Sequence, residues 1–181
     1  MSADGGIVIP ARLTAVDLAS RIDREPTEVC AVLAARGEPN SPEDFMAGDL
    51  AVAVARSLGA TVTVEARDLA LECLYELETK GELSSAPEGK AGTIVAGVTG
   101  TLDELDEMIE SVSERWTVAR MPVIDRNILR IGVHELINEP QTPTPVVVSE
   151  AVRLATTYST EKSAMFVNGV LATLAKTTRK S

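Results

Sequence analysis

The hydrophobic positions along the first 64 residues predict a small, mostly helical module. Each helix signal joins a capping residue or a proline to apolar residues three and four positions apart. Residues 1–6 precede these signals, are rich in glycine and predict a loose tail. Residues 60–64 alternate and are mostly β-branched, which is typical of a strand. The expected elements are helices over 15–21 (capped by Thr14), 26–36 and 41–58 (opened by Ser41), and one short strand over 60–64.

From residue 66 onward the helical period continues over longer stretches. The segment 91–116 fits one helix or two, bent near Gly97 or Gly100, and the proline-rich segment 139–145 is a rigid connector. The basic end, 178–181, is expected to fray. We therefore expect a mainly α protein in which five or so helices form an orthogonal bundle. The other helices are expected over 67–80, 121–138, 144–158 and 162–177.

Length and composition narrow the class of protein. The 181 residues are 45% hydrophobic, which is enough for one ordinary domain or two small ones. No apolar run approaches the roughly 20 residues of a membrane helix, and the first residues lack the features of a signal peptide. Two distant cysteines and a single histidine argue against a disulfide framework or a metal site built on these residues. The expectation is a cytoplasmic protein.

Charge is distributed unevenly along the chain, although the formal net charge is -10. Residues 1–64 contain five basic and nine acidic side chains, and residues 65–110 contain three basic and twelve acidic ones. Residues 111–181 reverse the balance, with nine basic and six acidic side chains. The plainest interpretation of 65–110 is a solvated acidic helix face, unless a basic partner docks there. Nucleic acid is therefore expected on the C-terminal third.

Motifs for catalysis and cofactor binding are missing from the sequence. It contains no phosphate-binding or dinucleotide-binding glycine motif and no HExxH or CxxC. His134 lies inside an apolar helical pattern and is interpreted as a packing residue with one hydrogen bond. Cys30 and Cys73 are interpreted as small core residues. The acidic set Asp103, Asp106 and Glu107 fits an exposed helix face better than a metal site. We expect no enzyme activity, no cofactor and no metal.

Two helix starts in the C-terminal third carry candidate binding residues. Asp125 and Arg126 lie near one of them, and Lys162 and Ser163 lie at the other. Free backbone amides and the helix dipole favour a phosphate at such a position. Phe166 follows within one turn, and it is either a base-stacking residue or part of the core.

Residues 66–181 resemble the NusB family of bacterial transcription antitermination factors. The resemblance rests on ARDLALECLYELE, on IDRNILRIGVHEL, on the region of Trp116, and on PVVVSEAVRLATTYSTEKSAMFVNGVLATLAK. It implies a double three-helix bundle that binds boxA RNA together with the ribosomal protein NusE, within the RNA polymerase antitermination complex on ribosomal RNA operons. The chain departs from the family pattern twice. Only Arg67 remains of an arginine cluster, and the loop 81–89 is short, which predicts a bundle trimmed to five helices.

Carried over residue by residue, the resemblance implies two sets of binding residues. The boxA-like RNA side comprises Arg67, Lys162, Ser163, Phe166 and Asn168, and the NusE side comprises Tyr75, Glu76, Asp125 and Arg126. Asn168 and Gly169 have an alternative structural role, because glycine permits close helix packing and asparagine can bond a neighbouring backbone. An acidic first helix of this domain suits a basic ribosomal protein.

Residues 9–65 resemble the small N-terminal module of bacterial translation initiation factor two. The shared features are T-x3-LA, then PTEV-x3-L-x3-G, then a helix ending in LG before a strand. Such modules are associated with contacts to ribosomal RNA or protein, whereas a plain helix-turn-helix packing pattern is the alternative. The net charge of this segment disfavours DNA reading. The expected domains are 1–65 and 66–181, meeting near residues 64–66.

The rival function is a protein–protein adaptor of the transcription or ribosome-assembly machinery that has lost most direct RNA binding. The missing arginine cluster favours this rival, and the retained TEKSAMFVNG segment opposes it. A salt-dependent RNA titration separates the two. An enzyme subunit is the third and weakest option, and turnover of a nucleotide or RNA would revive it.

Overall fold

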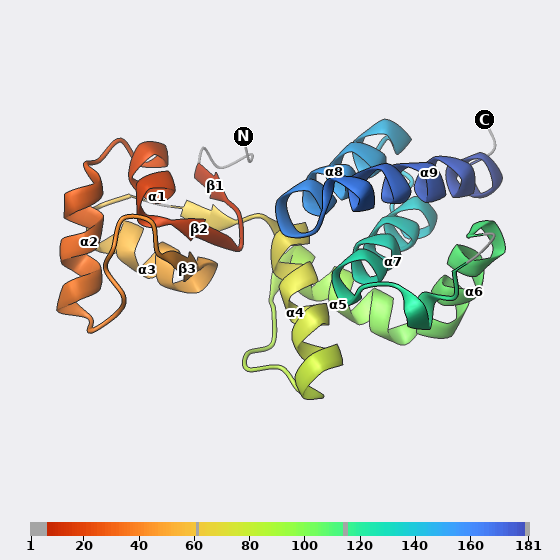
Figure 1. The fold of residues 1–181 in the computed structure, drawn as a ribbon, viewed down its shortest axis with the longest axis horizontal. Helices are drawn as coiled ribbons and strands as arrows, with labels where there is room; N and C mark the ends of the chain where they lie inside the picture. Colours follow the sequence, from red (N-terminus) through yellow and green to blue (C-terminus); the bar gives the residue numbers. More distant parts are fainter. Residues whose placement is uncertain (1–6, 61, 114–115, 180–181) are drawn as a thin grey trace. The chain divides into compact units, whose positions relative to one another are not determined.

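The computed structural model describes residues 7–60, 62–113 and 116–179, and the tail expected at 1–6 lies outside them. The chain divides into two compact units, residues 1–69 and residues 70–181 (Figure 1). The division falls inside one continuous helix, α4 (Ala66–Lys80). No helix among the described residues is long and apolar enough to cross a membrane.

The N-terminal unit contains three helices and two small sheets. The helices are α1 (Ala15–Arg21), α2 (Pro26–Ala35) and α3 (Gly48–Ser57). Strand β1 (Ile7–Ile9) pairs in parallel with β4 (Val62–Val64), and β2 (Arg12–Thr14) pairs antiparallel with β3 (Phe45–Ala47). Thr14 caps α1 as expected, through a hydrogen bond from the Asp17 amide to its Oγ1 at 3.1 Å. The core is apolar and includes Leu13, Leu18, Leu33 and Val54.

The expected start of the third helix at Ser41 is wrong. Ser41 instead closes a turn with Asp44, in which each backbone amide donates to the other residue. The next three residues form β3, where alternation buries Met46 and exposes its neighbours. The helix begins at Gly48, directly after the residues that pair with β2, and the chain passes close to β4 there. A Cβ atom on Gly48 would lie 2.7 Å from Cγ2 of Val64. The strand β3 and the contact between Gly48 and Val64 lie at this boundary, and the spacing of apolar residues along the sequence predicts neither of them.

The C-terminal unit is built around one buried helix, α7 (Val123–Asn138), which packs against α5, α6, α8 and α9. These helices cover Gly89–Gly100, Leu102–Val112, Thr144–Tyr158 and Glu161–Thr178. A short 3-10 turn over Val118–Arg120 precedes α7. Figure 1 shows α8 and α9 lying side by side, as their packing requires. The approach of α9 to α7 is close, because a Cβ on Gly132 would lie 2.7 Å from Leu171 Cδ1.

The segment 91–116, for which the sequence allowed one helix or two, forms two. Helix α5 ends at Gly100, and Thr101 (φ -133°) separates it from α6. The helices from α4 to α9 therefore number six among the described residues, and the expectation of a bundle trimmed to five is wrong. The loop 81–89 is short, but the break at Thr101 divides the segment 91–116 into α5 and α6, and this division gives the sixth helix.

The basic end of the chain does not fray at Arg179, contrary to expectation. Its guanidinium donates to the carbonyl oxygens of Leu136 at 2.8 Å, Glu135 at 2.9 Å and Glu139 at 2.6 Å. These carbonyls belong to the last turn of α7 and the residue after it, and of the three the Glu135 carbonyl also accepts from the Glu139 amide, at 3.0 Å. Arg179 thus caps α7 from the end of α9, whereas residues 180–181 lie outside the described part.

Candidate nucleic-acid interface

The start of α9 is organised by hydroxyl groups. Thr160 caps the helix, and its Oγ1 accepts a hydrogen bond from the Ser163 amide at 3.2 Å. Ser163 is buried, and its Oγ donates to Oδ2 of Asp125 at 2.8 Å. Ser163 therefore ties α9 to α7, and its hydroxyl is already engaged inside the fold. Lys162 is exposed beside it.

A hollow of about 310 Å³ opens next to this helix start. Its lining brings together Asp125, Lys162, Ser163 and Phe166, four of the residues expected to bind. Trp116, Met121 and Pro122 complete it. None of these three is a binding residue that the sequence predicts. The available signal for Trp116 was that it is the only tryptophan of the chain and lies within the NusB-like region.

A second hollow, of about 350 Å³, shares Trp116 and Phe166 with the first. Met165 and Gly169 also line it, and the side chain of Met165 is among the most exposed apolar groups of the described chain. Phe166 is half-buried, so it belongs neither wholly to the core nor wholly to the surface. Trp116 is 55% exposed. The two rings thus provide apolar surface at the junction of both hollows.

Asn168 and Gly169 are both exposed. Among the described residues, no heavy atom lies within 4 Å of a Cβ built on Gly169. The alternative that this glycine permits close helix packing is therefore wrong for Gly169. Asn168 remains a predicted RNA-binding residue.

Arg67 lies in the first turn of α4 and falls within the N-terminal unit. It is 9% exposed, and its Nη1 lies 3.5 Å from Oε1 of Glu65. The Glu65 carboxylate also accepts from the backbone amides of Arg67 and Asp68. Arg67 is thus an embedded, paired cation in its own unit, rather than an extended side chain on a surface.

Of the residues expected to contact a protein partner, Tyr75 and Glu76 lie on α4. Tyr75 is 44% exposed. Glu76 pairs with Lys80 at 2.8 Å and accepts from the Ser84 amide at 3.1 Å. These hydrogen bonds, from Lys80 first and then from Ser84, lower the pKa of Glu76 to about 2. On α4, Tyr75 therefore presents an exposed aromatic ring, and the Glu76 carboxylate next to it is ionised at neutral pH and paired with Lys80.

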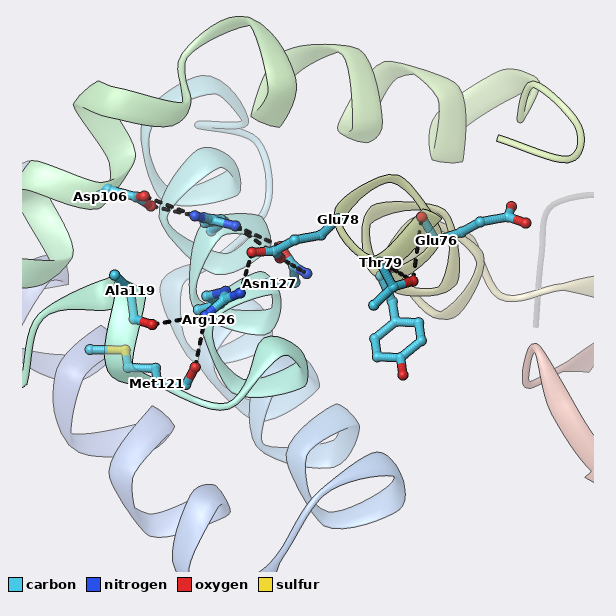
Figure 2. Close-up of polar contacts among 10 residues, drawn as sticks. Glu76, Glu78, Thr79, Asp106, Ala119, Met121, Arg126 and Asn127 are labelled. Carbon is cyan, nitrogen blue, oxygen red and sulfur yellow. Dashed lines mark hydrogen bonds and ion pairs between the residues drawn. The ribbon is translucent and has the colours of Figure 1, made fainter. Parts of the chain in front are cut away.

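Arg126, the fourth expected partner contact, is engaged in a polar network that Figure 2 shows. It forms an ion pair with Glu78 of α4, and its Nη1 donates to the Met121 carbonyl at 2.9 Å. Glu78 also accepts from Asn127 at 2.9 Å and lies 3.3 Å from Arg130. Arg130 in turn donates twice to Asp106 of α6, at 2.8 Å each. The network joins α4, α6 and α7, and Arg126 contributes the ion pair with α4.

Asp125, the remaining expected partner contact, is only 4% exposed. One carboxylate oxygen accepts from Ser163, and the other, Oδ1, has no hydrogen-bond partner among the described residues. The partner-binding roles of Asp125 and Arg126 stay predictions. Among the residues that the structure describes, no three metal-binding side chains gather in one place.

Comparison with known proteins places this geometry in a family. The model of the NusB family matches residues 51–176. The transcription antitermination protein NusB of Clavibacter michiganensis subsp. michiganensis is 40% identical over 130 residues, covering 62% of this chain and 95% of that protein. NusB from T. maritima has a similar structure, with a TM-score of 0.56 and 31% identity over 61% of this chain and 88% of that one.

A further solved structure, of the antitermination factors NusB and NusE in complex with dsRNA, matches with a TM-score of 0.54 and 29% identity. The match covers 62% of this chain and 94% of that one. The segment that fits the family model contains helices α4 to α8 and nearly all of α9, together with both hollows. On this evidence, the chain belongs to the NusB family.

Proposed function

We propose that this chain is a transcription antitermination factor that binds boxA-like single-stranded RNA together with NusE during ribosomal RNA transcription. It acts within the RNA polymerase antitermination complex, in the cytoplasm, and catalyses no reaction. The observation that supports the proposal best is the hollow where Trp116 and Phe166 lie beside Lys162. A related NusB in complex with NusE and dsRNA supports the coarser part of the proposal, that NusE and RNA are the partners.

The chemistry of the hollow suits a single strand. Unpaired bases stack on aromatic side chains, and this contact tolerates any base sequence. Lys162 is exposed at the same place and supplies a contact for a phosphate. Arg67 is largely buried and paired with Glu65, so it adds little to the cations that Lys162 offers to RNA. We therefore expect weak binding by the chain alone and a shallow dependence on salt.

NusE supplies the rest of the affinity in this proposal. Residues 65–110 carry twelve acidic and three basic side chains, and ribosomal proteins are generally basic. The exposed Tyr75 ring and the ionised Glu76 carboxylate give the partner an apolar and a charged contact on α4. NusE bound there adds its own cations to those of Lys162.

The test is a fluorescence titration of boxA-like RNA with the chain alone, with purified NusE, and with NusE plus the Phe166→Ala variant. Loss of one stacked ring should cost about 1–3 kcal/mol of binding. Phe45→Ala is the matched control, because the only other phenylalanine is 61% exposed in the N-terminal unit. Far-ultraviolet circular dichroism shows whether Phe166→Ala stays folded. An unfolded variant would assign Phe166 to the core.

The adaptor is the second candidate function, and the burial of Arg67 favours it. An adaptor binds NusE through α4 without preferring boxA-like RNA over a scrambled sequence. The same titration, repeated with a scrambled RNA and the wild-type chain plus NusE, decides between the two functions, because only the antitermination factor shows that preference.

A further inference from the structure

The small sheet formed by β2 and β3 in the N-terminal unit has one buried and one exposed face. Leu13 and Met46 are opposite each other in the register, and both belong to the apolar core. Their neighbours along the strands, Arg12 and Phe45, are exposed instead. The amide of Val16, at the start of α1, donates to the carbonyl of Pro42 at 3.3 Å, which brings the start of α1 against the segment leading into β3. The exposed surface, here called the Phe45 face, comprises Arg12, Val16, Phe45 and Ala47.

The ring of Phe45 already contacts one cation. The guanidinium carbon of Arg12 lies 4.9 Å from the ring centroid. In the register Arg12 is opposite Ala47 and Phe45 is opposite Thr14, so the stacked pair crosses the sheet diagonally. Phe45 is still 61% exposed with Arg12 in place, which leaves much of the ring to solvent. Exposed aromatic rings are typical of contact surfaces and attract cations.

The two segments that meet at the Phe45 face are acidic. Residues 11–20 and 41–50 carry four carboxylates and a single basic side chain, that of Arg12. Among the described residues these carboxylates accept hydrogen bonds from backbone amides and one hydroxyl, and none of them forms an ion pair. They are therefore available to a positively charged partner. The four are Asp17, Glu43, Asp44 and Asp49.

We propose that the Phe45 face docks an extended, lysine- and arginine-rich segment of a protein. One cationic side chain of that segment lies over the solvent-exposed part of the Phe45 ring, and others pair with the surrounding carboxylates. Val16 and Ala47 contact the aliphatic stems of these side chains. RNA does not fit this face, because the four carboxylates repel its phosphates.

The partner is a second protein besides NusE, which the proposed function assigns to α4. The inference therefore goes beyond that function and does not rest on it. Phe45→Ala also keeps its place as the control of the RNA titration, because neither RNA nor NusE occupies the Phe45 face.

The experiment measures binding of the full chain to a fluorescent ten-residue peptide of alternating lysine and alanine, by anisotropy at two salt concentrations. The wild type should bind this peptide, less tightly at the higher salt concentration, and should not bind the matched peptide of glutamate and alanine. Phe45→Ala should weaken binding about twofold to fivefold, the usual effect of an exposed cation–π contact. Phe45→Tyr keeps the ring and should bind as the wild type does.

Two double variants test the part played by charge. Asp44→Asn with Asp49→Asn removes two carboxylates beside Phe45 but retains an oxygen acceptor at each position. Asp103→Asn with Glu104→Gln is the matched control, because it removes the same charge from exposed positions in the first turn of α6. The first double variant should weaken peptide binding about twofold to tenfold, the combined effect of two exposed ion pairs, and the control should change it little.

Four results would overturn the assignment, and all leave the proposed function standing. The first is a wild type that does not bind the lysine peptide. The second is equal binding by wild type and Phe45→Ala with both double variants weakened alike, which shows a response to net charge alone. The third is weaker binding of boxA-like RNA by Phe45→Ala without NusE, which places nucleic acid at this face. The fourth is weaker binding of NusE by Phe45→Ala, which assigns the face to NusE and removes the second partner.

Discussion

Gly97 and His134 occupy one space between α5 and α7. A Cβ atom on Gly97 would lie 2.0 Å from Cε1 of the His134 ring. The ring is 7% exposed, and its Nδ1 lies 3.1 Å from Nδ2 of Asn138, as the interpretation of a packing histidine requires. The sequence suggested Gly97 as a possible bend, but α5 continues through it to Gly100. The glycine is needed for the close approach of the ring.

Gly97→Ala should destabilise the protein by about 1–3 kcal/mol, because the added methyl group displaces a buried ring. The sign of this change in the free energy of unfolding is informative, since alanine in a helix interior is otherwise favoured over glycine by about 1 kcal/mol. The measurement is the free energy of unfolding in urea. Gly100→Ala is the control, because among the described residues no atom lies within 4 Å of a Cβ there. Equal stability of the two variants would contradict the packing argument.

His134 also predicts a dependence of stability on pH. Burial lowers its pKa below the ordinary value of 6.5, against the opposing effect of Glu139 and Glu135. The unfolded chain therefore binds a proton more readily than the folded one. The contribution of His134 to the free energy of unfolding is complete above pH 6.5, and it is lost as the pH decreases through the lowered pKa. In the wild type the urea midpoint should be nearly the same at pH 8 and pH 7 and lower at pH 6, whereas it should stay level in His134→Gln. A parallel decrease in both proteins would exclude His134 as the cause.

At the scale of elements, charged and polar side chains join α4 to α6 and α7. Glu78 is the shared acceptor of Arg126, Arg130 and Asn127, and Arg130 carries the connection on to Asp106 (Figure 2). The side chains of Arg126 and Arg130 are 15% and 11% exposed, so solvent screens them only partly. Removing the Glu78 carboxylate leaves the partly buried charges of Arg126 and Arg130 with fewer acceptors to compensate for their lost hydration.

Glu78→Gln should lower the free energy of unfolding by about 1–3 kcal/mol, less than the 3–5 kcal/mol typical of a fully buried pair. Thermal unfolding of the full chain measures it. Glu76→Gln is the matched control two residues away, because its partner Lys80 is largely exposed and such pairs contribute little. If both variants unfold at the wild-type temperature, the network does not hold α4.

The long helices could be predicted from the sequence because their apolar period extends over several turns. The predicted helix over 144–158 matches α8 at both ends. Strands β1, β2 and β3 have only three residues each, too few for a period, and their pairing partners lie far along the chain. The same limit on prediction from residue spacing applies to the candidate site. Lys162 and Phe166 could be placed by helical spacing, but the burial of Asp125 and Arg67 depends on neighbours that the spacing does not reveal.

At the scale of the whole molecule, the two units share α4. The predicted boundary near 64–66 precedes this helix, whereas the structural division falls between residues 69 and 70, after its first turn. Glu65 explains why the earlier position is the better place to cut. Its Oε2 accepts from the amides of Arg67 at 2.7 Å and Asp68 at 3.0 Å, so it caps the helix. A fragment that begins at Glu65 retains that cap.

We predict that residues 65–181 fold alone, with one cooperative transition in urea followed by circular dichroism. The fragment contains α4 to α9 and the buried helix α7, around which the C-terminal unit is built. The control fragment 70–181 lacks Glu65 and the first turn of α4, and it should be less stable by about 1 kcal/mol, the usual cost of a lost cap. A fragment 65–181 without a cooperative transition would show that residues such as Leu69 or Leu71 need the N-terminal unit. In that case the chain folds as one inseparable whole, and the resemblance of residues 9–65 to a free module loses its support.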